Sequence, residues 1–258
     1  MSMQQPEHKS ISTQEIVFAN GNKAHTVFLP SDADVQDLPS LLNIPSFSGV
    51  IMLAGGAGFM EGNLYPNLAQ LFTHGIAHLA AERNMLIIDG GTQSGVMELM
   101  GMAIAEQGHR SSLLGVSPAG RVYYPGQPDE TEHEERTLLD PNHSHFVLGE
   151  TDEWGGETVT MYELANIFSR EHPSVAIIVN GGAIIISEAL YNVRQRRPMI
   201  VLEGSGRAAD DIARLWREKS ATIGDPNLAE IIEHGDIHLF PITGSPTALI
   251  ELMQHLLK

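Results

Sequence analysis

The sequence predicts an α/β fold in which a mainly parallel sheet carries helices on both faces and forms a single doubly wound domain. Short apolar runs alternate regularly with helical patterns along the 258 residues. Many of the runs are uniformly apolar, which is typical of strands that are covered on both faces. Glycine follows four of the runs, at the ends where such a sheet forms its ligand-binding edge.

Each element follows from its local pattern. Strands are expected at the apolar runs, which are residues 24–28, 49–53, 85–88, 112–116, 145–148, 175–179, 198–202 and 236–240. Helices are expected where apolar residues recur with the helical period, namely at residues 63–83, 94–107, 157–170, 184–194, 207–218, 226–233 and 246–257. Residues 118–143 form the longest irregular segment, and their acidic middle predicts a solvated excursion.

Composition and charge narrow the class of protein. With 42% hydrophobic residues the chain can bury a substantial core, and we predict an N-terminal extension, residues 1–22, followed by one domain, residues 23–258. No apolar run approaches the roughly 20 residues of a membrane span, and no secretory signal is visible. The absence of cysteine excludes disulfides and thiolate chemistry, and a cytoplasmic location is expected. A formal net charge of -17 opposes binding to nucleic acid.

Glycine-rich loops at four strand ends predict a phosphate site. The loops contribute Gly55, Gly56, Gly58, Gly90, Gly91, Thr92, Ser94, Gly95, Asn180, Gly181, Gly182, Glu203, Gly204, Ser205, Gly206 and Arg207. Glycine allows a ligand to approach the main chain closely, and the amides at the start of the following helices bind anions. Main-chain donors can therefore hold a phosphate although the chain is strongly acidic. The alternative for any single loop is a tight turn.

A nicotinamide-dependent enzyme is a further alternative. Gly56 and Gly58 begin a dinucleotide-binding pattern, but the next glycine, Gly62, comes one position late. Asp89 stands at the end of the next strand, where an acid would bind a ribose. No glycine loop is followed by the Lys-Ser or Lys-Thr of a Walker motif, and no G-x-S-x-G nucleophile elbow occurs.

Four stretches carry a resemblance to a known family. They read "DGGTQSGVMELMGMAIAE", "LGETDEWGGE", "NGGAIIISEAL" and "VLEGSGRAADDIARL". The chain resembles the SLOG superfamily over about residues 45–245, and more narrowly its prokaryotic LSDAT branch, which is related to the cytosolic N-terminal domain of melastatin-type transient receptor potential channels. The resemblance implies a Rossmann-like fold that binds a nucleotide-derived small molecule, such as ADP-ribose or a related dinucleotide, with no firmly implied cofactor. It also implies a homo-oligomer and a separate effector protein or domain.

Individual side chains can be assigned roles in such a site, each with a structural alternative. Arg207 begins a helix and suits bidentate contact with a phosphate, or else an ion pair with Asp210 or Asp211. Glu203 suits ribose hydroxyls, or else caps the following helix. Thr92 and Ser94 are expected either to donate to phosphate oxygens or to cap their helix.

Trp154 lies among residues that are normally exposed, so a base can stack on it. Tyr162 stands near the place where the channel relatives have a second partner, but it also fits the core. No metal site is assigned. His133, His143 and His145 match no standard ligand spacing and are interpreted as part of a solvated loop, and His74 and His78 lie on a surface stripe.

A more distant resemblance is to the Lonely guy phosphoribohydrolases, which release a base from a nucleoside monophosphate with a P-G-G-x-G-T-x-x-E motif. The aligned stretch here is "NGGAIIISE". Gly181, Gly182 and Glu188 match, whereas Ile184 and Ile185 replace the second glycine and the threonine. Glu188 could stabilise oxocarbenium-like charge as a catalytic residue, or be a helix-face glutamate without chemistry. The departure puts hydrolysis in doubt and leaves binding intact.

Overall fold

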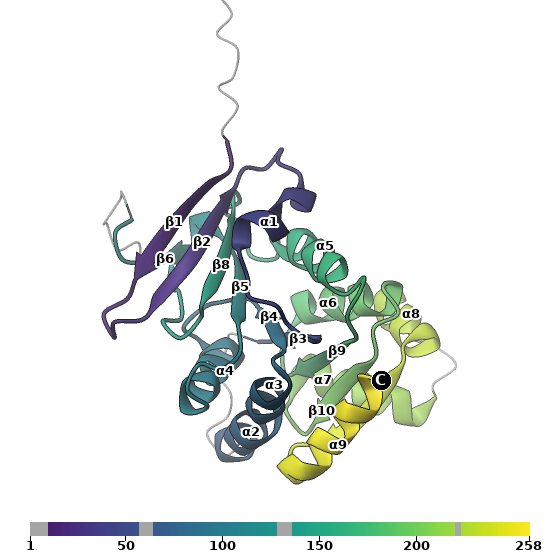
Figure 1. Cartoon of the computed structure of the whole chain (residues 1–258). Coiled ribbons are helices and arrows are strands. Elements are labelled where there is room, and N and C mark those ends of the chain that lie inside the picture. Colours follow the sequence, from purple (N-terminus) through teal and green to yellow (C-terminus); the bar gives the residue numbers. More distant parts are fainter. Residues whose placement is uncertain (1–9, 57–63, 128–135, 220–222) are drawn as a thin grey trace, which may run out of the picture.

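The computed structural model describes residues 10–56, 64–127, 136–219 and 223–258. Its centre is a nine-stranded sheet with helices around it, which confirms the predicted α/β fold (Figure 1). In order, the strands are β1 (Ser12–Val17), β2 (Lys23–Leu29), β3 (Val50–Gly55), β4 (Leu86–Asp89), β5 (Leu113–Pro118), β6 (Val122–Tyr123), β7 (Thr137–Leu138), β8 (His145–Gly149), β9 (Ser174–Val179), β10 (Met199–Glu203) and β11 (Ile237–Pro241).

The helices follow the predicted pattern closely. They are α1 (Leu38–Leu42), α2 (Tyr65–Leu71), α3 (His78–Arg83), α4 (Gly95–Glu106), α5 (Thr158–Phe168), α6 (Ala183–Arg194), α7 (Arg207–Glu218), α8 (Pro226–His234) and α9 (Pro246–Leu256), with short helical turns η1 (Val35–Asp37), η2 (Phe72–Ala77) and η3 (Ala119–Arg121). The helical pattern expected at 63–83 is divided into α2, the π-helical turn η2 and α3. None of the described helices is long and apolar enough to cross a membrane.

The strand order places a ligand-binding edge at a defined point. The order is β1-β2-β8-β5-β4-β3-β9-β10-β11, and all neighbours are parallel except β1 and β2. From β3 the chain proceeds outward through β4 to β5, and from β9 it proceeds the other way through β10 to β11. The direction in which successive strands are added to the sheet therefore reverses between β3 and β9. Such a switch point opens a crevice at the carboxyl ends of the strands.

Two apolar cores cover the two faces of the sheet. One core contains residues of α1 and α5 to α8, and the other contains residues of α2, η2, α3, α4 and α9, and Figure 1 shows these groups on opposite sides of the sheet. Successive residues of β3 alternate between them, because Met52 belongs to the first core while Ile51 and Leu53 belong to the second. This is the physical reason why the central strands are uniformly apolar.

The N-terminal edge holds the elements that the sequence did not indicate. Strand β1 lies within the segment interpreted as an extension and pairs with β2 from Lys23 to Phe28. Its local pattern was weak because Ile16 is its only buried residue. Within the long irregular segment, β6 pairs with β7, and Val122, Tyr124 and Leu139 pack with Phe146 in a third, smaller core.

Candidate functional site

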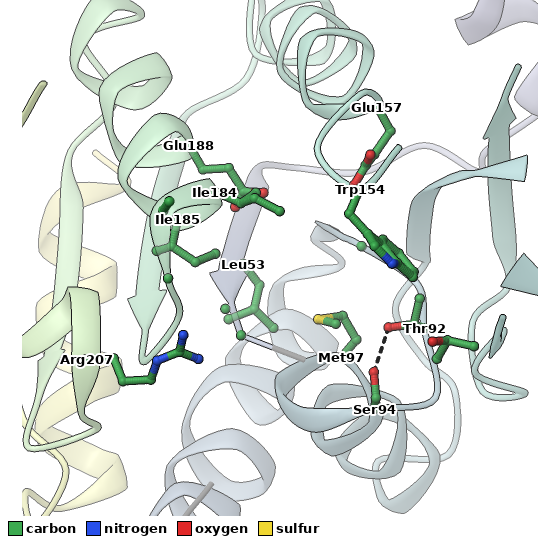
Figure 2. A pocket seen from close by; sticks show the side chains of 16 residues that line it. Leu53, Thr92, Ser94, Met97, Trp154, Glu157, Ile184, Ile185, Glu188 and Arg207 are labelled. Atoms are coloured by element: carbon green, nitrogen blue, oxygen red, sulfur yellow. Dashed lines mark hydrogen bonds between the residues drawn. The ribbon is translucent and has the colours of Figure 1, made fainter. Parts of the chain in front are cut away.

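A cavity of about 640 Å³ opens at the carboxyl ends of the central strands. It lies at the switch point, because Leu53, Gly55 and Gly56 at the end of β3 face Gly182 at the start of α6. Figure 2 shows Arg207 and Glu188 reaching toward it from one side and Trp154 from the other. A pocket of this size accommodates a nucleotide-sized ligand.

Half of the described residues that were predicted to bind a ligand line this cavity. The lining residues are Gly55, Gly56, Gly90, Thr92, Ser94, Trp154, Gly182 and Arg207, and Glu188 joins them. Gly91, Gly95, Asn180, Gly181, Glu203, Gly204, Ser205 and Gly206 are not in the lining. Gly58 lies outside the described residues. Three of the four glycine loops therefore reach the cavity through glycine, and the fourth reaches it through Arg207.

The start of α6 supplies main-chain donors to the cavity. Gly182 is the N-cap, and the amides of Gly182, Ala183 and Ile184 donate to no other residue in the described ranges. A Cβ atom added to Gly182 would lie 3.0 Å from Nη2 of Arg207, so the guanidinium adjoins these amides. Free amides at a helix N-terminus beside an arginine form an anion site that needs no further positive charge.

Arg207 is available for a ligand because its neighbouring acids have other partners. Oδ1 of Asp210 accepts a hydrogen bond from the amide of Gly204 at 2.7 Å, and Asp211 pairs with Arg214 at 3.4 Å. The ion pair that was the structural alternative for Arg207 is therefore not formed. Arg207 itself has a φ of 53°, a left-handed conformation that is unusual outside glycine and asparagine.

The loops after β9 and β10 are fastened to each other. The amides of Ala208 and Ala209 donate to the carbonyl oxygens of Gly181 and Asn180, each at 3.2 Å. Oγ of Ser205 accepts from the amide of Asn180 at 2.8 Å. The first amides of α7 are thus consumed within the protein, so α7 contributes a side chain to the cavity and α6 contributes the free amides.

Glu203 is occupied by an ion pair. Its two carboxylate oxygens accept from Nε and Nη2 of Arg217 at 2.8 and 2.7 Å, and this interaction lowers the pKa of Glu203. Glu203 neither lines the cavity nor caps α7. The structure therefore does not place Glu203 for the ribose contact that the sequence suggested.

The loop after β4 rests on a buried cluster of charged side chains. Nε2 of His143 lies 2.8 Å from Asp89, and its Nδ1 lies 3.0 Å from Asp140. All three side chains are inaccessible to solvent. Burial alone lowers the pKa of His143, but the charges of both aspartates and the hydrogen bonds to them raise it to about 9.

This cluster corrects the interpretation of two histidines. His143 and His145 do not lie in a solvated loop, since they are only 1% and 8% exposed, while His133 lies outside the described residues. No group of three His, Asp or Glu side chains in the described ranges is arranged to hold a metal ion. Asp89 is also buried and does not line the cavity, so the ribose role that supported a nicotinamide enzyme has no geometric basis here.

The buried cluster positions the loop that carries Thr92. Oδ1 of Asp89 accepts from the amide of Gly91 at 2.7 Å, and the amide of Asp140 donates to the carbonyl of Gly91 at 2.9 Å. Thr92 forms an isolated bridge with Leu139, and its hydroxyl lies 3.0 Å from that of Ser94. Ser94 is the N-cap of α4 without a side-chain capping bond, so this hydroxyl pair faces the cavity rather than closing the helix.

Two carboxyl groups, those of Glu157 and Glu188, also line the cavity. Glu188 is 7% exposed, and its carboxyl group has no hydrogen-bond or ion-pair partner among the described residues. Burial raises its pKa to about 8, with further contributions from the charges of Glu157 and Asp89. Burial also raises the pKa of Glu157, although the amide of Gly155, which donates to Oε2 of Glu157 at 2.9 Å, opposes the shift.

The remaining lining is largely apolar. Trp154 is 42% exposed beside the cavity, so its ring is accessible to a ligand. Leu53, Met97 and Ile185 contribute aliphatic surface, and Figure 2 shows Leu53 and Met97 between the two polar sides. Tyr162 belongs to the core, where it is fully buried.

The sequence agrees with one described family. A family model described as "SLOG in TRPM, prokaryote" matches residues 48–251, and this span contains every described residue that lines the cavity. The chain belongs to this family.

Curated relatives of this SLOG domain are long channel proteins. It is 27% identical over 209 residues to a transient receptor potential cation channel, subfamily M member 7, from Homo sapiens. The aligned region covers 70% of the chain and 11% of the channel. It is also 27% identical over 212 residues to the subfamily M member 2 channel of Rattus norvegicus, an alignment that covers 69% of the chain and 13% of the channel. A subfamily M member-like 2 protein of Nematostella vectensis is 29% identical over 203 residues, which cover 65% of the chain and 13% of that protein. The chain thus spans about an eighth of the relatives it matches.

Several lining residues of the SLOG domain were missed from the sequence. They are Leu53, Met97, Thr137, Glu157, Ala183, Ile184 and Ile185. Glu157 stands two residues beyond Gly155, in the loop already singled out for Trp154, so its position beside an aromatic candidate was the available signal. Ile184 and Ile185 were recognised as departures from the Lonely guy motif, and the structure places this added bulk in the cavity wall.

Proposed function

We propose that this SLOG domain binds a nucleotide-derived phosphorylated small molecule, such as ADP-ribose or a cyclic ADP-ribose-like compound, at the carboxyl edge of the sheet. The observation that carries the proposal is the convergence of free amides at the start of α6 with the guanidinium of Arg207 on one cavity. Such a pairing binds a phosphate or diphosphate.

The proposal assigns a part of the ligand to each part of the cavity. The phosphates lie against Gly182, Ala183 and Arg207, where local donors offset the net charge of -17. The base stacks on Trp154, since base–aromatic stacking tolerates any base. The names of the matched relatives state that they are channels, so the resemblance, rather than those names, supports ADP-ribose as the first ligand to test.

Replacing Arg207 with glutamine should weaken the binding of ADP-ribose by about 10- to 100-fold, because hydrogen bonds between charged groups contribute about 1.5–3 kcal/mol. Isothermal titration calorimetry with ADP-ribose, cyclic ADP-ribose isomers, NAD and AMP measures the effect. Arg214→Gln is the matched control, because Arg214 lies on the same helix but pairs with Asp211 and Glu218 at the surface. The proposal fails if the folded wild-type protein binds none of these compounds.

A second candidate function is hydrolysis of a nucleotide N-glycosidic bond, favoured by the unpartnered carboxyl of Glu188 in the cavity. With a pKa of about 8, Glu188 keeps its proton at neutral pH and can give it to the departing base as the glycosidic bond breaks, while water adds to the sugar carbon and its released proton restores that of Glu188. Glu157 then supplies the carboxylate for oxocarbenium-like charge.

Glu188→Gln should abolish release of the base, measured chromatographically from AMP or another nucleoside monophosphate. Glu251→Gln, at an exposed position of α9, should leave the rate unchanged. Absence of any base release by the wild-type protein would leave binding as the function. A homo-oligomer, a separate effector and a cytoplasmic location stay predictions.

A further inference from the structure

We propose that Glu157 and Glu188 act together as a carboxyl pair that binds hydroxyl groups of the ligand's sugar and thereby selects among phosphorylated ligands. The inference rests on the proposed function and deepens it, because it concerns the specificity of the same cavity. It also assigns to this pair the sugar contact for which Glu203 was the candidate in the sequence.

Glu188 is the observation on which the pair depends. It lies in the second turn of α6, lines the cavity and is only 7% exposed. No described residue bonds to its carboxyl group, and its oxygens are not among the fully buried polar atoms without a partner, so the carboxyl group is presented to the cavity. A ligand that fills the cavity with hydrogen-bonding groups would satisfy it.

Glu157 faces the same space from the other wall. It is the N-cap of α5, half-buried, and one of its oxygens is held by the amide of Gly155. The amide favours the charged form of Glu157, whereas Glu188 receives no such help. The charge of Glu157 also raises the pKa of Glu188, so Glu157 is the more readily ionised member of the pair and Glu188 holds its proton more tightly.

The other titratable groups around Glu188 support this distribution. Asp89 acts on it from the end of β4 and adds negative charge. The hydroxyl of Tyr162, on α5, stays neutral beside Glu188, because burial raises its pKa well above its ordinary value. Arg207 lines the same cavity but forms no ion pair with Glu188, so it remains free for the phosphate.

A pair with one proton and one charge is suited to hydroxyl groups. It offers one donor and several acceptor positions, which match the combined donor and acceptor character of a sugar hydroxyl. A second phosphate would be repelled by the charge of Glu157. The spacing is also suitable, because Ile184 and Glu188 are four residues apart on α6, a rise of about 6 Å, which is comparable to the separation between a phosphate and the hydroxyls of its ribose.

Three adenosine diphosphate compounds test the inference: ADP-ribose, ADP, which lacks the terminal ribose, and 2′,3′-dideoxy-ADP, which also lacks the two hydroxyls of the adenosine sugar. Affinities are measured by calorimetry for wild type, Glu188→Gln, Glu157→Gln and the control Glu153→Gln, which lies exposed in the same loop outside the cavity lining. At one of the two steps, wild type should lose about 10- to 100-fold in affinity. That ratio should fall toward one in both cavity variants and stay unchanged in the control.

The ratio of two affinities on one protein is insensitive to the fraction of each variant that is folded. If ligands bind and depend on Arg207 but the ratios in Glu188→Gln and Glu157→Gln equal those of wild type, the carboxyl pair is overturned while the proposed function stands. If no ligand binds the folded wild-type protein, both are overturned.

Discussion

Replacement of His143 with alanine is expected to lower the free energy of unfolding by about 3–5 kcal/mol at neutral pH, the cost of removing one partner from a buried ion pair. The imidazole contacts both Asp89 and Asp140, and without it two buried aspartates face each other unneutralised. One oxygen of Asp89 already lacks a partner among the described residues. Urea denaturation followed by circular dichroism measures the change.

The pH dependence identifies the cause of this loss. The pKa of His143 is about 9 in the folded protein against an ordinary value of 6.5, so its contribution is complete below about pH 6.5 and disappears as the pH rises through 9. The difference between wild type and variant should shrink over that range. Adding Asp140→Asn to His143→Ala should recover part of the stability, because it removes one of the stranded charges.

His234→Ala is the matched control for His143→Ala, since the His234 side chain is 61% exposed on α8. It should change the free energy of unfolding by no more than about 0.5 kcal/mol. A loss below 1 kcal/mol for His143→Ala, or a loss that does not depend on pH, would contradict the role assigned to the buried cluster.

Glu188→Gln is expected to make the protein more stable than wild type at alkaline pH. The pKa of Glu188 is raised from 4.5 to about 8 on folding. The folded protein therefore holds this proton more tightly, and wild type loses stability as the pH rises from about 4.5 to 8. Glutamine cannot ionise, so the variant should gain about 2–5 kcal/mol relative to wild type above pH 8.

Thermal and urea unfolding between pH 5 and pH 9 measure this gain. Glu251→Gln serves as the control because Glu251 is exposed on α9, away from the cavity. Parallel stability curves for wild type and Glu188→Gln across the whole range would show that Glu188 ionises normally. Glu157→Gln should produce a change in the same direction, because burial raises the pKa of that carboxyl group too.

The central sheet was predictable because its signal is local. Strands such as β3 and β9 are apolar at nearly every position since both faces are covered, and each is short enough to stand out between helical patterns. Strand β1 was not predictable, because an edge strand with one buried residue, Ile16, looks like any polar segment. Its pairing with β2 stabilises it through main-chain hydrogen bonds, which leave no mark in the sequence.

The candidate site was predictable where it depends on the main chain and less so where it depends on side chains. Glycines at the ends of β3, β4 and β9 line the cavity, because the carboxyl ends of neighbouring parallel strands share one edge of the sheet. The pairing of Glu203 with Arg217 spans 14 residues and that of Asp89 with His143 spans 54. Such partners are chosen by tertiary packing, so sequence patterns could not distinguish an acid that is free from one that is occupied.

The fastening between the loops that follow β9 and β10 determines how the cavity can change shape. Asn180, Gly181 and Ala208 are joined by direct hydrogen bonds, so we expect the free amides of α6 and the guanidinium of Arg207 to keep a fixed spacing. Adjustment to ligands of different length should therefore occur across the cavity, at Trp154 and Glu157. Phosphate affinity should then be nearly constant across ligands, and discrimination should be decided at the far end.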